Sequence, residues 1–463
     1  MKQIKVGYLP LYIKLYDDNN QDRTPLVSYM QTLVQMLQGQ GLEIVLADEV
    51  CRVKEEFTRA VQKFNQAGVD AVITQHLAYS PSLESIEALM QLDAPIIVFD
   101  TTPDYALIRT ASYQNCIDND HGIHGVQDMC AMLKKKRKPF HICAGHALHS
   151  DVVSRVVGLC RAAAVRKRFI TARIGSVGGS FAGMGDFLIS DAQFKQQIGA
   201  DVLYMTPEIV HSYLQQVTEA EIDAEIAADT VKYQSEITSH TAYREATRSG
   251  LAIRKWMEAE KLCACTVNFL TLDTCGMPKM PFPECCKILE RCQGYAGEGD
   301  VLTAGLVGAL ISQYPNTTFT EMFCPDWEQN VILLSHMAES NPNLARWKPL
   351  LADMQFHYNS CGNTVGMYNC YRPGSVVYVN LSPMDDHFHF IVSRGEILDA
   401  GLHNGAYRRN TQGWFKPCKA LPEFLEEYSM AGGTHHSAMV YDVPVEEIKA
   451  FGQMMGFQVI EIQ

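Results

Sequence analysis

The stretch "LEIVLADEVCRVKEEFTRAVQKFNQAGVDAVITQHL", Leu42–Leu77, shows the pattern that decides the fold of the N-terminal part of the chain. The apolar run that begins at Leu42 predicts a strand. "KEEFTRAVQKFNQAG" predicts an amphipathic helix that ends at Gly68, and "VDAVITQHL" predicts a second strand. Strands that alternate with helices of this length favour a parallel sheet with helices on both faces.

The same alternation extends in both directions along the chain. Thr24-Pro25 predicts the start of a helix between a strand near Ile4 and the strand at Leu42. A second α/β unit is predicted from the strands "RFITARIGSVGG", "GADVLYMTP" and "CTVNFLTLD" and from a long helix near residues 219–250. In sheets of this kind the ligand site lies beyond the carboxyl ends of the strands.

The C-terminal part of the chain has a different pattern. "GSVVYVNLSPMDDHFHFIVSRGEILDAG" predicts consecutive strands, with Asp385-Asp386 or Arg394-Gly395 at turns. "VEEIKAFGQMMGFQVIEI" then predicts a small final element made of a helix and a strand. The expected fold class is therefore α/β, with N-terminal and central α/β domains that contain parallel sheets and a mainly antiparallel β domain at the C-terminus. The expected domain ranges are 1–168, 169–318 and 319–463.

Composition excludes several classes of protein. The net charge of the 463 residues is −13, which argues against a nucleic-acid partner, and we interpret the basic run at Lys134–Lys138 as a solvated helix end. No apolar run reaches the ~20 residues of a membrane-spanning helix. The N-terminal sequence shows no cleavage site, so we expect a cytoplasmic protein whose 15 cysteines are thiols. Six of them lie between Cys263 and Cys292 without a CxxC pair, which favours core thiols over a zinc site.

A glycine-rich stretch, "GSVGGSFAG" at Gly175–Gly183, follows a predicted strand. It lacks the GxGxxG spacing of a dinucleotide site, and no GxxxxGK[ST] motif occurs in the chain. We interpret the stretch as a loop at a strand end that contacts the ligand, with Gly175 as its candidate substrate-binding residue.

Four further stretches place carboxylates and imidazoles in apolar or glycine-rich surroundings: Glu298 in "YAGEGDVLTAG", Glu321 in "TTFTEMF", His336 in "VILLSHMAES", and His435 and His436 in "GGTHHSAM". A carboxylate in apolar surroundings needs a partner or its pKa rises. Together these side chains are a plausible ligand set for a divalent cation with open positions, and mixed oxygen and nitrogen ligands suit Mn²⁺ or a similar ion.

The set "GYAGEGD", "TFTEMF", "LLSHMAESNP" and "AGGTHHSA" closely resembles the L-arabinose isomerase family, within the wider L-fucose/L-arabinose isomerase superfamily, and the resemblance covers most of residues 95–463. It implies a third domain that is barrel-like. It implies Mn²⁺ held by Glu298, Glu321, His336 and His436, with His435 beside them as a substrate-binding or supporting group. It also implies a homo-oligomer, a trimer or hexamer, in which the active site takes residues from the next subunit. His121 is the nearest match to a substrate-contacting histidine of that kind.

The residue types fit the implied chemistry, because moving a proton between C2 and C1 of a sugar through an enediol needs a base and an acid, roles that Glu298 and Glu321 can exchange. The sugar-facing stretches "YLPLYIKLYDD" and "GSVGGSF" and the sequence after His121 depart from the family pattern. We therefore expect a metal-dependent aldose–ketose isomerase for a free pentose, hexose or deoxyhexose. A non-catalytic sugar-binding protein and a metal-dependent sugar epimerase stay open as alternatives.

Overall fold

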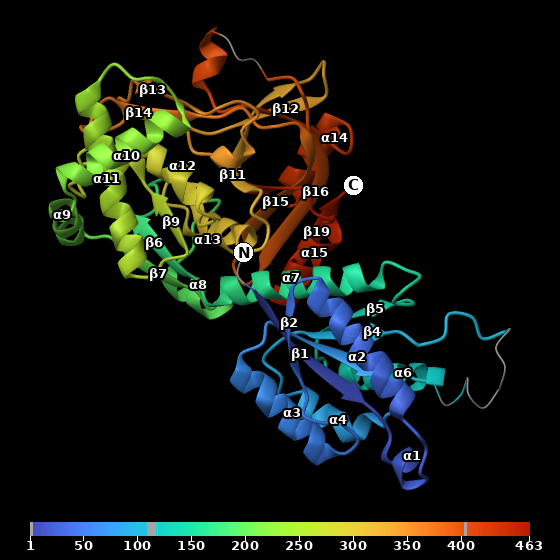
Figure 1. Cartoon of the computed structure of the whole chain (residues 1–463). Coiled ribbons are helices and arrows are strands. Elements are labelled where there is room, and N and C mark those ends of the chain that lie inside the picture. The colour runs from blue at the N-terminus through green and yellow to red at the C-terminus, as the bar shows by residue number, and fades with distance from the viewer. Residues whose placement is uncertain (1–2, 109–116, 118, 402–404) are drawn as a thin grey trace. The chain divides into compact units, whose positions relative to one another are not determined.

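The computed structural model describes residues 3–108, 117, 119–401 and 405–463. The chain forms two compact units that divide between Lys167 and Arg168 (Figure 1). None of the helices in these described ranges combines the length and apolar character needed to cross a membrane. The three domain ranges expected from the sequence stay a prediction, and each unit is described by itself.

The N-terminal unit contains a five-stranded parallel sheet with the strand order β2-β1-β3-β4-β5. Its elements are β1 (Ile4–Leu11), α1 (Lys14–Asp18), α2 (Thr24–Gly39), β2 (Leu42–Leu46), α3 (Lys54–Ala67), β3 (Ala71–His76), α4 (Ser82–Leu89), β4 (Ile96–Asp100), α6 (Ile123–Lys135), β5 (Phe140–Ala144) and α7 (Val152–Ile170), which continues into the second unit.

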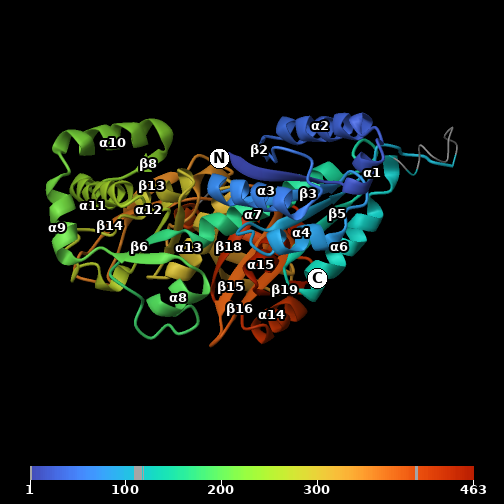
Figure 2. The ribbon, with the colours of Figure 1, turned by 90° about the horizontal axis from the view of Figure 1, so that it is seen from below.

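The Leu42–Leu77 stretch folds as its pattern predicts, into β2, α3 and β3. Phe57, Val61 and Phe64 form the apolar stripe of α3 and are buried in one core cluster with residues of α4 and α6. Helix α3 ends where Gly68 adopts a φ of +59°, a left-handed conformation that glycine takes without steric cost. Helix α2 lies on the other face of the sheet (Figure 2). The expectation of a parallel sheet covered on both faces is confirmed for this unit.

The second unit begins with a four-stranded parallel sheet of order β10-β9-β6-β7. This sheet and the elements around it are β6 (Arg173–Val177), α8 (Asp191–Gln197), β7 (Asp201–Tyr204), α9 (Pro207–Gln215), α10 (Glu219–Lys232), β8 (Gln234–Glu236), α11 (His240–Ala259), β9 (Ala264–Val267), the 3₁₀ turn η1 (Phe269–Thr271), α12 (Phe282–Glu290), β10 (Gly294–Gly297) and α13 (Val301–Ile311). The central α/β unit expected from the sequence is therefore present.

The single long helix expected near residues 219–250 is wrong, because the segment forms two helices. Between α10 and α11, β8 leaves the helical path and pairs with β13 (Leu350–Met354), which belongs to a distant part of the chain. A new cap then starts α11, where the side chain of Ser239 accepts a hydrogen bond from the backbone of Ala242. Tertiary strand pairing thus outweighs the helical pattern at this point.

The C-terminal part of the second unit is a closed antiparallel barrel. Six strands follow the order β15-β18-β11-β12-β17-β16, and the pairing of β16 with β15 closes the ring, while β19 joins β16 in parallel. The elements are β11 (Thr317–Asp326), β12 (Val331–Ser335), η2 (Pro342–Leu344), β13, β14 (Thr364–Tyr368), β15 (Gly374–Pro383), β16 (Phe388–Ile397), η3 (Gly405–Arg409), β17 (Gly413–Pro417), α14 (Leu421–Met430), β18 (His436–Tyr441), α15 (Val445–Met455) and β19 (Gln458–Ile462). The expected fold class, with parallel α/β sheets and an antiparallel barrel-like C-terminal region, is confirmed.

The two turns proposed for the C-terminal strands have different outcomes. Asp385-Asp386 lies in the turn between β15 and β16, as expected. Arg394-Gly395 lies inside β16, where Gly395 pairs with both Val376 and Pro417, so the turn expected there is wrong. A β-carbon at Gly395 would clash with the ring of Phe415, so the glycine permits the close approach of β17 to β16.

Helix α13 connects the central sheet to the barrel. Every residue from Val301 to Ile311 is buried, and the helix packs against β9 and β10 of the sheet and against β11 and β18 of the barrel (Figure 1). A helix that is apolar on all sides belongs in the core of a large unit. The N-terminus of α13 is capped by Asp300 and lies directly after the carboxyl end of β10, next to the candidate site.

Candidate metal centre

Glu298 stands at the junction between β10 and α13 in a conformation that is unusual for its residue type. Its φ is +62°, in the left-handed region that non-glycine residues seldom adopt and that clusters at functional sites. Its amide donates to the carbonyl of Val267 at 3.0 Å, and its carbonyl accepts from the amide of Phe181 at 3.1 Å. The backbone therefore fixes this carboxylate at the carboxyl edge of the central sheet.

Strand register places the other carboxylate of the predicted set among the histidines. Glu321 on β11 pairs with His436 on β18 and, on its other side, with Ser335 at the end of β12. His336 is the residue after Ser335, so it emerges on the same end of the barrel. Glu321 Oε2 lies 3.7 Å from His336 Nε2.

Three imidazoles meet the two glutamates from different elements. His436 Nε2 lies 3.3 Å and His435 Nε2 lies 3.7 Å from Glu298 Oε2. The ligand atoms of Glu298, His435 and His436 lie within 4.8 Å of one another, and those of Glu321, His336 and His436 do so as well. The structure thus brings together five of the residues singled out in the sequence, in two overlapping groups that share His436.

Each of these histidines has its Nδ1 atom against a second carboxylate. His436 Nδ1 donates to Asp300 at 3.0 Å, and His435 Nδ1 donates to Asp186 at 2.7 Å. His336 Nδ1 lies against the carboxylate of Glu339. Because an ionised carboxylate only accepts hydrogen bonds, the contacts of His435 and His436 place a proton on Nδ1 and turn Nε2 toward Glu298.

The supporting carboxylates are themselves held by the fold. Asp300 accepts a hydrogen bond from the backbone of Thr303 at 2.8 Å and so caps α13 while it orients His436. Glu339 is buried and accepts a hydrogen bond from the hydroxyl of Tyr295 on β10. Such contacts fix the tautomer and ring orientation of histidines that bind metals.

Aromatic side chains enclose the inner side of the cluster. His436 is fully buried and stacks on Phe187 with ring centroids 4.9 Å apart and planes 9° apart. Phe319 on β11 packs its ring at a steep angle against His336, at 4.8 Å, and against His436, at 5.0 Å. His435 remains partly exposed, so the open side of the cluster lies there.

The two glutamates have pKa values that are driven in opposite directions in the metal-free protein. Burial raises the pKa of Glu298, but the imidazoles of His435 and His436 have a larger opposing effect and lower the pKa to about 2. Burial raises the pKa of Glu321 above its usual range despite the opposing effect of His336. Pairs of carboxylates whose pKa values diverge are typical of sites that carry out acid–base chemistry.

His435 and His436 have raised pKa values for a related reason. Burial lowers the pKa of His436, but Asp300 and Glu298 raise it to about 9. For His435 the effect of burial is outweighed by Asp186 and Glu298, and the pKa rises to about 10. The negative charge around the imidazoles therefore attracts a cation, which is a proton in the metal-free protein.

These residues fit a divalent cation. His436 Nε2 is buried and has no hydrogen-bond partner within the described part of the chain, although two carboxylates lie beside it. An imidazole nitrogen left unpaired among carboxylate oxygens is a donor set that borderline divalent ions bind. The ligands that the sequence analysis assigns to such an ion, Glu298, Glu321, His336 and His436, all belong to this cluster.

Two predicted substrate-binding residues lie outside the cluster. His121 belongs to the N-terminal unit, where its Nε2 lies 2.8 Å from the hydroxyl of Tyr16, and its contact with a substrate stays a prediction. Gly175 lies inside β6, paired with Leu203 and Cys265, and a β-carbon there would come within 2.6 Å of the ring of Trp256. The strand extends through Val177, three residues into the stretch predicted to be a loop, so Gly175 packs inside the central sheet, and its contact with a substrate stays a prediction.

Four residues of the site lie outside the set predicted from the sequence: Asp186, Phe187, Asp300 and Glu339. A local signal existed for Asp300, which follows Glu298 in the "GEGD" motif, and for Glu339, which stands three residues after His336. No local signal marks Asp186 and Phe187, because they lie far along the chain from the histidines that they contact.

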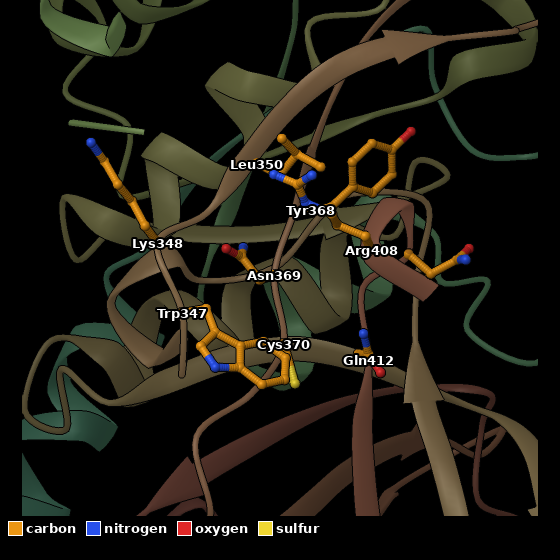
Figure 3. A pocket seen from close by; sticks show the side chains of 9 residues that line it. Trp347, Lys348, Leu350, Tyr368, Asn369, Cys370, Arg408 and Gln412 are labelled. Atoms are coloured by element: carbon orange, nitrogen blue, oxygen red, sulfur yellow. The ribbon is translucent and has the colours of Figure 1, made fainter. Parts of the chain in front are cut away.

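A separate pocket lies where β13 begins and β14 ends. It is lined by Trp347, Lys348, Leu350, Tyr368, Asn369, Cys370, Arg408, Asn410 and Gln412 (Figure 3). Its interior of about 10 Å³ is close to the minimum for one water molecule. None of the candidate residues named above lines it. It is too small for a sugar, and the cluster around Glu298 and Glu321 is the stronger candidate.

Comparisons with known proteins agree with the geometry. A family model described as the L-arabinose isomerase central domain matches residues 189–313, and one described as the L-arabinose isomerase C-terminal domain matches residues 316–458. The chain is 24% identical to the L-arabinose isomerase of Aeromonas salmonicida, with 100% of this chain and 95% of that protein aligned. It is 23% identical to the L-arabinose isomerase of Tolumonas auensis over the same shares of both chains.

Among solved structures, the chain is similar to a periplasmic solute-binding protein from Actinobacillus succinogenes with bound D-allose. The identity is 11%, the TM-score is 0.19, and the match covers 67% of this chain and 91% of that one. A TM-score this low bears on neither fold nor function. The two matching family models and the full-length relatives, together with the convergence of Glu298, Glu321, His336 and His436 at one site, show that the chain belongs to the L-arabinose isomerase family.

Proposed function

We propose that the protein is a metal-dependent aldose–ketose isomerase that converts a free pentose, hexose or deoxyhexose through an enediol intermediate. Membership of its family makes it a sugar isomerase, an intramolecular oxidoreductase. The observation that carries the proposal is the meeting of Glu298 and Glu321 around the shared His436, with pKa values that diverge. A protein that only bound a sugar would have no need of two such proton-transfer groups.

Glu298, Glu321, His336 and His436 are the proposed ligands of the cation, and Mn²⁺ is the ion we propose. When bound, a divalent cation polarises the sugar oxygens and stabilises the negative charge that develops on them. Asp300 and Glu339 keep the rings of His436 and His336 in the orientation that this role requires.

Proton transfer between C2 and C1 of the open-chain sugar is the proposed role of the two glutamates. One glutamate takes the proton from C2 and the other delivers a proton to C1, with both carboxylates held beside the same imidazoles. In the reverse direction the two residues exchange roles. A positioned acid or base of this kind contributes about 10²–10⁴-fold to the rate.

Phe187 and Phe319 exclude water from the inner side of the cluster, which strengthens the electrostatic interactions there. His435, on the open side, is the proposed point of approach for the sugar. We further propose a cytoplasmic homo-oligomer, a trimer or hexamer, in which His121 of one subunit reaches the sugar bound by the next. L-Arabinose is one candidate substrate, since the relatives are named for it.

The experiment is an assay of ketose formation from a panel of aldopentoses, aldohexoses and 6-deoxyhexoses, with Mn²⁺ or with a chelator. We expect turnover of at least one sugar that the chelator abolishes. Glu298→Gln and Glu321→Gln should each reduce turnover by at least about 10²-fold. Glu423→Gln, an exposed carboxylate in α14, is the matched control and should leave turnover unchanged. Turnover of both site variants at the wild-type rate would refute the proposal.

A further inference from the structure

The parallel sheet of the N-terminal unit has a point at which its strand order reverses. In the order β2-β1-β3-β4-β5, β2 lies on one side of β1, and β3, β4 and β5 follow on the other. In open α/β sheets a ligand binds beyond the carboxyl ends of the strands at such a point. The segments at the carboxyl ends of β1 and β3 therefore line the position where this unit should meet a ligand.

Two segments of the chain lie at this point. Helix α1 begins at Lys14, shortly after β1 ends at Leu11. The turn that contains His121 packs on the end of β3, because a β-carbon at Gly122 would come within 2.7 Å of the carbonyl oxygen of His76, the last residue of that strand. The glycine thus lets the backbone of the turn approach the strand end closely.

One side chain from each segment joins the two. The hydroxyl of Tyr16 on α1 lies 2.8 Å from Nε2 of His121. The centroids of the two rings are 5.6 Å apart, and the ring planes are tilted by 41°. A phenol hydroxyl both donates and accepts hydrogen bonds, so Tyr16 holds the imidazole ring in either of its tautomers.

Helix α1 is held in place by charged groups and not by an apolar face. None of its residues is buried, and no side chain caps its N-terminus. Oδ2 of Asp17, next to Tyr16, accepts a hydrogen bond from Nη1 of Arg23 at 2.5 Å and another from Nη1 of Arg52 at 2.6 Å. Arg52 is itself paired with Glu56 of α3 at 2.6 Å. The two guanidinium groups therefore fix α1 on the unit, and with it the hydroxyl of Tyr16.

We propose that Tyr16 is a positioning residue for His121 and that the choice of sugar depends on it. The inference rests on the proposed function, in which His121 contacts the sugar. A ring that Tyr16 fixes from one side directs its hydrogen bond to one sugar hydroxyl, so it selects against epimers that lack a hydroxyl in that position. Tyr16 belongs to "YLPLYIKLYDD", one of the stretches that depart from the family pattern, so the contact is a feature of this chain's own sequence.

The test compares variants of the full-length protein with Mn²⁺, on the sugar that the wild type turns over fastest and on its epimers. Tyr16→Phe keeps the ring and removes the hydroxyl. We expect it to raise KM about tenfold and to leave kcat within about twofold, because a contact that serves binding and not proton transfer acts on KM. The preference for that sugar over its epimers, as a ratio of kcat/KM values, should fall as well. Damage to the fold would instead lower kcat and leave the preference unchanged.

Helix α1 offers a matched pair of variants at adjacent positions. Asp17→Asn loses the charge that the two arginines hold, and we expect KM to rise as it does in Tyr16→Phe. Asp18→Asn removes only an exposed ion pair with Lys14, at 2.6 Å, and should leave KM unchanged. In a His121→Gln background Tyr16→Phe should have no further effect, because residues that act as one unit are not additive. A wild-type KM in Tyr16→Phe, or full additivity with His121→Gln, would overturn the inference.

A binding measurement separates this inference from the proposed function. Titration calorimetry of the protein and Mn²⁺ with alditols, open-chain polyols that cannot isomerise, reports affinity without turnover, and Tyr16→Phe should raise the Kd about tenfold. A wild type that binds an alditol in this Tyr16-dependent way but turns over no sugar would refute the proposed function and leave the inference in place. Turnover of a sugar by the wild type, together with an unchanged Kd in Tyr16→Phe, would overturn the inference alone. The absence of both binding and turnover would refute both.

Discussion

The α-carbon of Gly297 faces the ring of His336, and a β-carbon built on it would lie 2.8 Å from His336 Cε1 and 3.2 Å from Glu339 Oε2. No larger residue fits between β10 and the imidazole without displacing one of them. The glycine before Glu298 therefore permits the central sheet and the barrel to approach closely enough for their side chains to form one cluster.

Gly297→Ala should consequently damage the centre and the fold together. Inserting a methyl group into a closely packed site costs about 1–3 kcal/mol of folding free energy. Because the clash falls on His336 and Glu339, we expect a weaker affinity for Mn²⁺ and lower turnover, measured by titration calorimetry and by the isomerase assay. Gly39→Ala in α2, where a β-carbon meets nothing within 4 Å, is the control and should change neither. Wild-type affinity in Gly297→Ala would contradict the arrangement described.

Asp300 has two roles that different substitutions can separate. It caps α13 through the backbone of Thr303 and orients His436 through Nδ1. Asp300→Asn keeps a good helix cap but loses the carboxylate, so we expect an affinity for the cation that is about 10–100-fold lower with little change in stability. Asp300→Ala should show the same loss of affinity and a further cost of about 1 kcal/mol in urea unfolding. Equal stability of the two variants would show that the cap contributes nothing.

The metal-free protein should lose stability as the pH rises through the neutral range. The pKa of His436 is about 9 in the folded protein against an ordinary value of 6.5. Below pH 6.5 the imidazole is protonated in both states and its contribution is fully present; between pH 6.5 and about 9 only the folded state keeps the proton, and the contribution is lost. Urea unfolding with chelator at these two pH values measures the change.

His436→Gln should reduce that dependence on pH, which makes it the control for the assignment. Glu298 should give the opposite dependence of stability on pH. Its pKa is lowered from 4.5 to about 2, so its contribution to stability is present above pH 4.5 and is lost as the pH falls toward 2. A stability that stays constant from pH 6.5 to 9 in wild type would contradict the environment described for His436.

Removal of the cation should lower the melting temperature of the second unit. An ion that binds only the folded state stabilises it by about 2.7 kcal/mol at a free concentration about 100 times its Kd. All proposed ligands lie in residues 168–463, so in differential scanning calorimetry we expect the chelator to shift the transition of this unit and leave that of the N-terminal unit in place. An unchanged thermogram would count against a metal site.

The elements could be predicted from the sequence where a short-range pattern controls them. The strand–helix–strand stretch at Leu42–Leu77 has a clear apolar period and a glycine at the end of its helix, and it folds as expected. The segment near residues 219–250 has a continuous helical pattern, yet β8 interrupts it by pairing with β13. That partner lies more than a hundred residues away, so no local pattern contains the information.

The residues of the site also divide into those that a local sequence pattern marks and those that it does not mark. Glu298, Glu321, His336 and His436 could be chosen because each has a polar group in apolar or glycine-rich surroundings, and the family motifs named the same residues. Their convergence depends on the register of β11, β12 and β18, which the sequence does not show. Asp186 could not be found, because it meets His435 across 249 positions of the chain.

The place of β18 in the barrel has a consequence for synthesis of the protein. β18 lies between β11 and β15, both of which the ribosome makes earlier, and it carries His436. Until β18 emerges from the ribosome, these two strands have open hydrogen-bonding edges, which can pair with other nascent chains. The cluster can therefore form only after β18 has been made, and a message truncated before residue 436 would yield a product with an incomplete barrel and an incomplete cluster.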